Sequence, residues 1–179
     1  SKHRPRNDPS LFKGGNIPFV QTGEVAQSKY NRNIIEEAKR FYNKNGLAQS
    51  KLWPKGTLCI TIAANIAETG FLSMEACFPD SVVGFTSLTG EDTAWYVKHF
   101  LTATQSQIIK FAPATAQKNI NLEIIGDLLF PLPPLAEQHA IVERVYKLLA
   151  MVDQLEQQVA ERKVQAEELM QAVLREAFG

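Results

Sequence analysis

The sequence predicts an α+β domain followed by a long coiled-coil α-helix, and two observations support this fold class. In the N-terminal part, short apolar runs of strand length alternate with stretches of helical periodicity between glycine and proline turns. From Leu135 to Ala177 there is neither glycine nor proline, and apolar residues recur at heptad spacing. The Pro133-Pro134 pair separates these two patterns. We therefore expect a small mixed α/β domain over residues 1–132 and a long helix over residues 133–179.

The first third of the domain is expected to contain one strand and one helix. Residues 1–13 are basic and hold two prolines, which is typical of an extended arm. Residues 17–20 predict a short edge strand because proline occupies the second position, and the Thr22-Gly23 pair predicts a turn. Residues 31–45 place apolar side chains at i, i+1, i+4, i+7 and i+8, just before Gly46. This periodicity, ended by a glycine, predicts a helix.

The remainder of the domain is expected to contain several short strands and a second helix. Turns with glycine or proline precede three apolar runs that predict strands, over residues 58–63, 71–76 and 81–88. Glu91 and Asp92 suit the positive end of a helix dipole and begin a helical pattern that reaches Leu101. A polar strand or loop is expected over residues 115–121, and a short apolar strand over residues 128–130.

The heptad stripe of the long helix is too long to be buried against the preceding domain. The 43 residues from Leu135 to Ala177 span about 65 Å, whereas a domain of this size has a diameter of about 35 Å. We therefore expect about half of the helix to project and to pair with a second helix. Two of the eleven stripe positions, Arg162 and Glu176, are polar. The nine apolar pairing positions are Ile141, Val145, Leu148, Val152, Leu155, Val159, Ala166, Leu169 and Val173.

Charge is balanced over the chain but unevenly distributed along it. The 19 lysine and arginine residues equal the 19 acidic residues, so the total charge predicts no nucleic-acid partner. Residues 1–55, however, carry 11 basic and 4 acidic residues. A basic third can face a polyanion locally, or it can be a solvated surface, and charge alone favours the solvated surface.

Sequence motifs for catalysis and for metal binding are absent. The chain has no GxxxxGK phosphate loop, no GxGxxG turn, no GxSxG nucleophile motif and no HExxH zinc pair. Its two cysteines, Cys59 and Cys77, are too few for a disulfide framework or a CxxC zinc site and fit a reducing cytoplasm. No apolar run reaches the ~18 residues of a membrane span, and no signal peptide is recognisable. We expect a recognition module with no catalytic residue, metal or cofactor of its own.

Three stretches of the sequence resemble a known family. They are residues 14–25 (GGNIPFVQTGEV), residues 56–60 (GTLCI), and residues 115–121 (TAQKNIN) followed by the run FPLPPLAEQ at 130–138. Together they resemble the DNA sequence-specificity (S) subunit of Type I restriction–modification systems, and the proline-rich run into a long helix is the most specific of them. That subunit is similar to two tandem copies of a target recognition domain plus a long helix. This chain carries one copy, as expected of a half-subunit or a fragment.

The resemblance implies a division of labour between this chain and its partners. Each recognition domain would read one half of a bipartite double-stranded DNA target, while paired antiparallel helices hold two domains apart. Methyltransferase (M) subunits with S-adenosylmethionine and restriction (R) subunits with ATP and magnesium would perform the chemistry, so this chain itself is expected to be no enzyme. A cytoplasmic location in a bacterium or archaeon follows. Since only one copy is present, the helix of a second chain would complete a homodimer.

The resemblance also directs attention to polar residues that could contact DNA. Basic side chains position a protein on phosphates, whereas glutamine and asparagine can read base edges through paired hydrogen bonds. The phosphate candidates are Arg4, Arg6, Lys13, Lys29, Arg32 and Lys118. The base-reading candidates are Gln21, Gln27, Gln117 and Asn119, with Thr22 beside them.

Two other functions stay open at the level of the sequence. One is a recognition module of another methyltransferase system. The other is a non-catalytic coiled-coil assembly protein that binds no DNA. A salt titration separates a DNA binder from an assembly protein, because DNA affinity falls steeply as salt displaces protein from phosphates.

Overall fold

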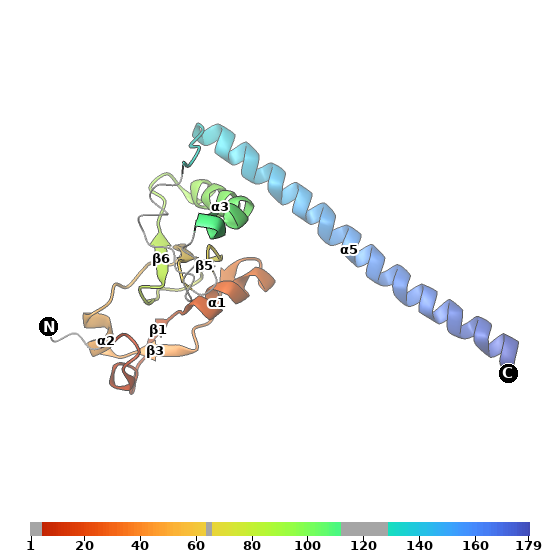
Figure 1. Ribbon diagram of the computed structural model, residues 1–179, viewed down its shortest axis with the longest axis horizontal. Coiled ribbons are helices and arrows are strands. Elements are labelled where there is room, and N and C mark those ends of the chain that lie inside the picture. The colour runs from red at the N-terminus through yellow and green to blue at the C-terminus, as the bar shows by residue number, and fades with distance from the viewer. Residues whose placement is uncertain (1–4, 64–65, 112–128) are drawn as a thin grey trace.

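A four-stranded sheet lies at the centre of the domain that precedes the long helix (Figure 1). This computed structural model describes residues 5–63, 66–111 and 129–179. The strand order is β2 (Ile34–Ile35), β5 (Thr69–Leu72), β4 (Leu58–Thr61) and β6 (Val82–Phe85). The β2–β5 pair is parallel and the other two pairs are antiparallel. All four residues of the inner strand β4 are buried, as expected for a strand covered on both faces.

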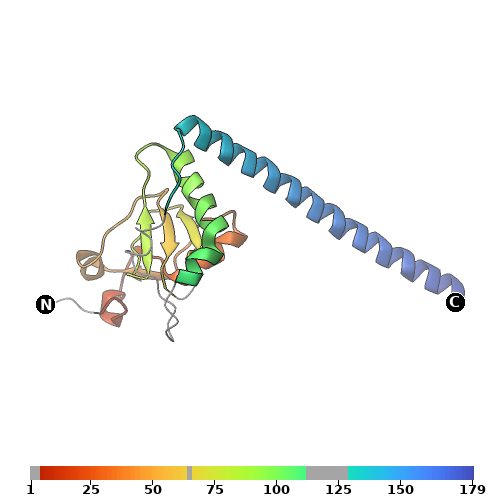
Figure 2. The ribbon, with the colours of Figure 1, turned by 45° about the horizontal axis from the view of Figure 1, so that its top comes forward.

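Helices cover both faces of this sheet, and the alternation of side chains along β4 separates two apolar clusters. Leu58 and Ile60 pack with α3 (Glu91–Phe111), which crosses one face of the sheet (Figure 2). Cys59 points the other way and packs with Val25 of α1 (Thr22–Gln27). Because successive side chains of a strand point to opposite faces of the sheet, α3 and α1 pack on opposite sides of β4 in separate apolar clusters.

A small two-stranded sheet forms a second structural unit beside the first. Strand β1 (Ile17–Phe19) pairs antiparallel with β3 (Arg40–Tyr42). The 3₁₀ turn η1 (Pro9–Leu11) and the short helix α2 (Lys44–Ala48) belong to the same region. The Phe19 and Tyr42 rings lie 4.2 Å apart, and Leu11 packs beside them with 1% of its surface exposed. The expectation of an extended arm over residues 1–13 is therefore wrong for its described part, because Leu11 anchors this segment in the core.

The predicted helix over residues 31–45 is wrong. That segment forms β2, β3 and the start of α2, and it is preceded by the 3₁₀ turn η2 (Ser28–Tyr30). Arg32 and Asn33 adopt positive φ angles of 50° and 62°, which a right-handed helix does not allow. The segment still buries Ile35, Ala38 and Tyr42, whereas Phe41 is exposed. Ile34 and Ile35 are extended because β2 pairs with the distant strand β5. Tertiary pairing has overridden a local periodicity.

Smaller differences concern where elements begin and end. The Thr22-Gly23 pair begins α1 instead of forming a turn, and Thr69-Gly70 lies inside β5. Helix α3 extends ten residues beyond Leu101, to Phe111. Of the predicted strand over 128–130, Leu129 and Phe130 are described and are not in a strand. The segment 115–121 lies outside the described residues. The α+β class and the long C-terminal helix are confirmed.

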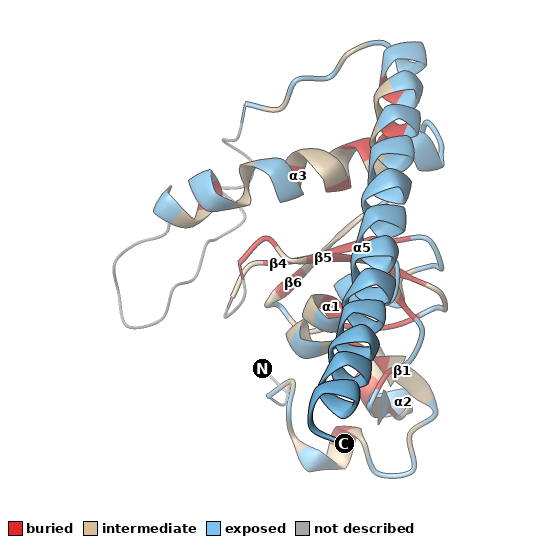
Figure 3. Ribbon diagram, turned by 90° about the vertical axis from the view of Figure 1, so that its right-hand side faces the viewer, coloured by how far each residue is buried: buried red, intermediate tan, exposed pale blue. Residues whose placement is uncertain are grey.

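Helix α5 (Leu135–Phe178) begins after Pro134 and projects from the domain for most of its 44 residues (Figure 1), and beyond its first turns it is coloured as exposed (Figure 3). Only its first turns contact the domain, against α3, where Gln138 and Val142 are buried. Ile141 and Val145 are half-buried, and every residue from Tyr146 onward is exposed. The predicted stripe is thus uncovered along most of its length. None of the described helices is long and apolar enough to span a membrane.

Candidate nucleic-acid interface

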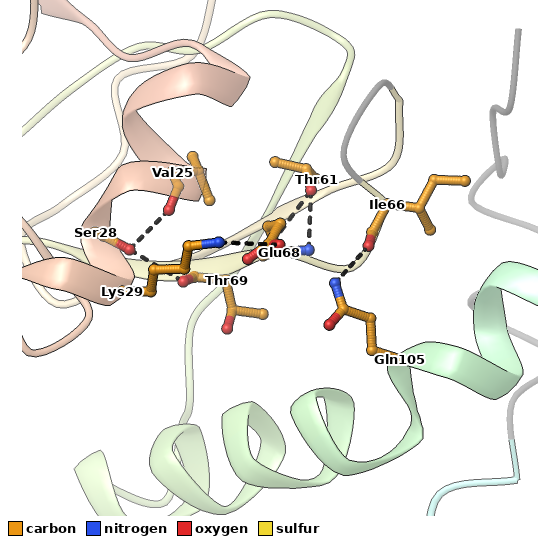
Figure 4. Close-up of polar contacts among 8 residues, drawn as sticks. All are labelled: Val25, Ser28, Lys29, Thr61, Ile66, Glu68, Thr69 and Gln105. Carbon is orange, nitrogen blue, oxygen red and sulfur yellow. Dashed lines mark hydrogen bonds and ion pairs between the residues drawn. The ribbon is translucent and has the colours of Figure 1, made fainter. Parts of the chain in front are cut away.

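Three of the predicted DNA contacts, Gln27, Lys29 and Arg32, are exposed at the end of α1 and in the turn that follows it. Buried Ser28 fastens this end of α1 to the sheet. Its hydroxyl donates to the carbonyl of Val25 at 2.7 Å or to that of Thr69 at 3.1 Å (Figure 4). A rigid support therefore carries these exposed polar side chains.

The backbone after Ser28 forms a tight turn with internal hydrogen bonds. The Ser28 carbonyl accepts from the N–H groups of Asn31 and Asn33, each at 2.8 Å. The chain leaves the turn into β2, where the Phe71 N–H donates to the Asn33 carbonyl at 2.8 Å. Both ends of the turn are therefore joined to the central sheet. We call residues 28–33 the 28–33 turn.

Positive charge is available on the 28–33 turn. The Lys29 ammonium lies 4.0 Å from the Glu68 carboxylate and 5.3 Å from the centre of the Tyr30 ring. Because about half of the Lys29 side chain is exposed, this long ion pair contributes little to stability. Arg32 is exposed and forms no hydrogen bond or ion pair with the described residues. Both cations can therefore approach a phosphate without breaking a strong contact.

Arg6 and Lys13 lie in the other unit of the domain, where their carbonyl groups accept hydrogen bonds from Tyr42 of β3 and from Asn43 at the start of α2. The Arg6 guanidinium donates to the Gln49 carbonyl at 2.5 Å and to Asp80 at 3.1 Å. The Tyr42 hydroxyl donates to the Arg6 carbonyl at 2.8 Å. Arg6 thus joins segments far apart in the sequence, and a phosphate would have to compete with these contacts. Lys13 is exposed.

The remaining predicted contacts are only partly described. Gln21 and Thr22 are half-buried at the start of α1, where the Gln21 N–H donates to the Glu24 carboxylate at 3.3 Å. Four candidates lie outside the described residues: Arg4, Gln117, Lys118 and Asn119. The described candidates therefore fall into separate groups, and the three exposed ones that share one region are Gln27, Lys29 and Arg32, at the end of α1 and in the turn after it.

Ionisable groups whose pKa values are shifted by partial burial lie elsewhere, where α3 meets α5. Burial, together with the neighbouring Lys98 charge, lowers the pKa of His99 to about 4, so this imidazole is neutral at pH 7. Burial and the nearby carboxylates of Asp92 and Glu91 raise the pKa of Tyr146 to about 12. The Trp95 and Tyr146 rings, 5.4 Å apart, pack across this joint. These groups serve as packing between two helices.

A cavity of about 750 Å³ lies between the sheet and the N-terminal end of α3. Phe71 and Trp95, whose rings are 4.3 Å apart, form part of its wall, and Lys55 and Glu91 also line it. Lys55 and Glu91 are the only titratable residues among its lining residues, which include no histidine or cysteine. Among the described residues, no group of three or more histidine, cysteine or acidic side chains could hold a metal ion.

Sequence reasoning missed Tyr30, Asn31 and Asn33, which share the 28–33 turn with the predicted cations. Tyr30 is 84% exposed, whereas Phe41, the next most exposed aromatic ring of the domain among the side chains that the structure describes, is 42% exposed. The run of lysine, tyrosine, asparagine and arginine at 29–32 was a usable signal. The helix predicted over residues 31–45 obscures this signal, because it includes Asn31 and Arg32.

Known proteins resemble this chain in sequence. Residues 1–162 match the family described as Type I restriction modification DNA specificity domain. The EcoBI specificity subunit of Escherichia coli is 35% identical over 74 residues, which are 41% of this chain and 16% of that protein. The EcoDI specificity subunit of Escherichia coli is 35% identical over 88 residues, 49% of this chain and 20% of that protein. The StySPI specificity subunit of Salmonella potsdam is 42% identical over 65 residues, 36% of this chain and 14% of that protein.

Two solved structures resemble the chain in fold. One comes from work on complex assembly and conformational transition of the type I R-M system. It matches 98% of this chain and 41% of its own chain, with a TM-score of 0.71 and 21% identity. The other is the HsdS subunit from Thermoanaerobacter tengcongensis, matching 93% of this chain and 38% of its own, with a TM-score of 0.67 and 21% identity. The chain therefore spans at most about a fifth of the curated relatives' length and about two fifths of the solved chains.

Proposed function

The chain belongs to the family of Type I restriction modification DNA specificity domains, and from this membership we propose that it recognises one half of a bipartite DNA target. The observation that carries the proposal is the family match over residues 1–162, which takes in the whole domain and more than half of α5. The exposed cations of the 28–33 turn support it.

Recognition of DNA by this domain would combine two kinds of contact. Lysine and arginine side chains on phosphates set position and affinity, and amide side chains on base edges set sequence. Lys13, Lys29 and Arg32 are the exposed phosphate candidates among the described residues. Gln27 is the exposed base-reading candidate at the end of α1. Arg4, Gln117, Lys118 and Asn119 keep the roles proposed for them from the sequence.

Catalysis would belong to other subunits. We propose that methyltransferase and restriction subunits bring S-adenosylmethionine, ATP and magnesium, and that this chain neither methylates nor cleaves DNA by itself. The proposal also places the chain in the cytoplasm, where chromosomal DNA is found. Labelled methyl transfer to DNA by the purified chain alone would contradict it.

Helix α5 would set the distance between two recognition domains. Its exposed apolar stripe needs a cover, and an antiparallel second copy would place one domain at each end. Two identical domains related by a twofold axis read a palindrome interrupted by an unread spacer. We therefore propose a homodimer with such a target wherever the chain acts without a second, different recognition domain.

A salt titration tests the proposed DNA binding. The purified 179-residue chain is mixed with duplex DNA of random sequence between about 50 and 200 mM salt. Lys13, Lys29 and Arg32 together would contribute about −2.7 to the log–log slope, because each neutralised phosphate contributes about −0.9, and Arg4 and Lys118 would make the slope steeper. An assembly protein that does not use DNA would bind weakly, with a slope near zero.

A further inference from the structure

The 28–33 turn presents an aromatic ring to solvent between two cations. Tyr30 is 84% exposed, and Lys29 and Arg32 stand on either side of it in the chain. A single exposed aromatic side chain is ordinary on a protein surface. An exposed ring between exposed cations matches duplex DNA, in which apolar base edges and sugars lie between two lines of phosphates.

Hydrogen bonds within the turn also hold its backbone in a defined conformation. Two successive residues other than glycine, Arg32 and Asn33, have φ angles of 50° and 62° in the left-handed region that such residues rarely adopt. The surrounding hydrogen bonds hold this backbone. The Ile34 N–H donates to the Asn31 carbonyl at 2.8 Å, and the Asn31 amide donates back to the Ile34 carbonyl at 3.3 Å. A preformed turn loses little conformational entropy when it binds.

Packing beneath the turn leaves no room for it to sink into the domain. A Cβ atom on Gly70 of β5 would collide with the Ser28 side chain, so glycine at this place lets the turn approach the sheet closely. Ser28 is 3% exposed, whereas Tyr30, two residues later, is 84% exposed. The turn therefore rests on the sheet at Ser28 and projects at Tyr30.

We propose that the 28–33 turn enters a groove of the DNA, where the Tyr30 ring packs against base edges while Lys29 and Arg32 contact the flanking phosphates. This rests on the proposed function and adds a residue that determines sequence preference. Lys29 would exchange its 4.0 Å pairing with Glu68 for a phosphate. The Tyr30 ring would meet apolar base surface such as a thymine methyl group.

Selection from a randomised duplex DNA pool tests this assignment. The full chain and its Tyr30→Ala variant are each used to enrich sequences, and affinity for the wild-type consensus and for random DNA is then measured. Tyr30→Ala should lose about 5- to 100-fold of the preference at one or two base pairs, the range expected for one specific base contact. Affinity for random DNA should change by less than about threefold, since phosphate contacts dominate it.

Two further variants assign the effect to the ring. Tyr30→Phe keeps the ring face and should retain the wild-type preference. Leu88→Ala removes a 101% exposed apolar side chain that precedes α3 and should also behave as wild type. Loss of preference in Tyr30→Phe equal to that in Tyr30→Ala would overturn the assignment to the ring face.

The failures of the two proposals are distinguishable. A wild-type preference that survives Tyr30→Ala unchanged overturns the inference and leaves the proposed function standing. A wild-type chain that enriches no sequence overturns the proposed function and the inference with it. Tyr30→Ala should melt at the wild-type temperature, because its side chain is almost fully exposed.

Discussion

Leucine and valine have opposite environments in the domain and in helix α5. In the domain, Leu58 and Val25 are fully buried. On α5, Leu148 is 47% exposed and Leu155 is 59% exposed, although both belong to a regular heptad stripe. The domain therefore encloses its own core, whereas the helix exposes an apolar stripe for which we propose a second helix as partner. The free energy of unfolding of the domain should therefore not depend on chain concentration, whereas the pairing proposed for α5 should depend on it.

The largest effect is expected when two leucines of the heptad stripe on α5 are shortened to alanine. In Leu148→Ala with Leu155→Ala, each substitution should cost about 2–5 kcal/mol of dimer stability, as for other leucines buried in a packed core. Sedimentation at micromolar concentrations should show a dimer for the wild type and a monomer for the double variant. Val164→Ala, 54% exposed and off the stripe, should remain dimeric. A monomeric wild type at tens of micromolar, with α5 still helical, would contradict the pairing.

The same substitution inside the domain should behave differently. Leu58 lies opposite Phe71 and Phe85 in the sheet, so Leu58→Ala leaves a cavity and should lower the free energy of unfolding by about 2–5 kcal/mol. Both tryptophans, Trp53 and Trp95, lie in the domain, so their fluorescence during urea unfolding measures it. The loss should be equal at two chain concentrations tenfold apart. A concentration-dependent loss would mean that the domain does not fold independently of dimerisation.

The two regions also differ in how far their sequences predict them. Helix α5 was predicted within two residues because its heptad pattern is local and needs no knowledge of what it packs against. The segment 31–45 was mispredicted because Ile34 and Ile35 are fixed by Phe71 and Leu72 of β5, more than 30 residues away. Among the candidate site residues, the charge of Lys29 and Arg32 suggests phosphate contacts, and the structure shows that both are exposed. The structural role of Arg6 depends on Gln49 and Asp80 and was invisible in the sequence.

The joint between the two regions should respond to pH through His99. Its pKa of about 4 lies below the ordinary 6.5, so protons favour the unfolded chain between these values. The contribution of His99 is therefore complete above about pH 6.5 and is lost as the pH falls toward 4, by about 1–3 kcal/mol. Urea unfolding of the wild type and His99→Gln at pH 4.5, 5.5 and 7 measures the difference. Carboxylate effects common to both proteins cancel, and an equal pH slope in both would exclude His99 as the cause.

The smallest expected effect separates the two regions by their contact with DNA. Lys29→Ala should reduce the magnitude of the log–log salt slope by about 0.9, because one phosphate contact is lost, and should weaken binding to all sequences alike. Lys163→Ala removes an exposed lysine from the projecting part of α5 and should leave the slope unchanged, since we propose that the helix acts only as a spacer. Arg6→Ala should instead lower the stability of the domain, because its guanidinium bonds Gln49 and Asp80. Fluorescence anisotropy on one random duplex measures the salt slopes of Lys29→Ala and Lys163→Ala, and urea unfolding measures the stability of Arg6→Ala. A slope that falls equally in Lys29→Ala and Lys163→Ala would mean that DNA lies along the helix as well, and that the helix is not only a spacer.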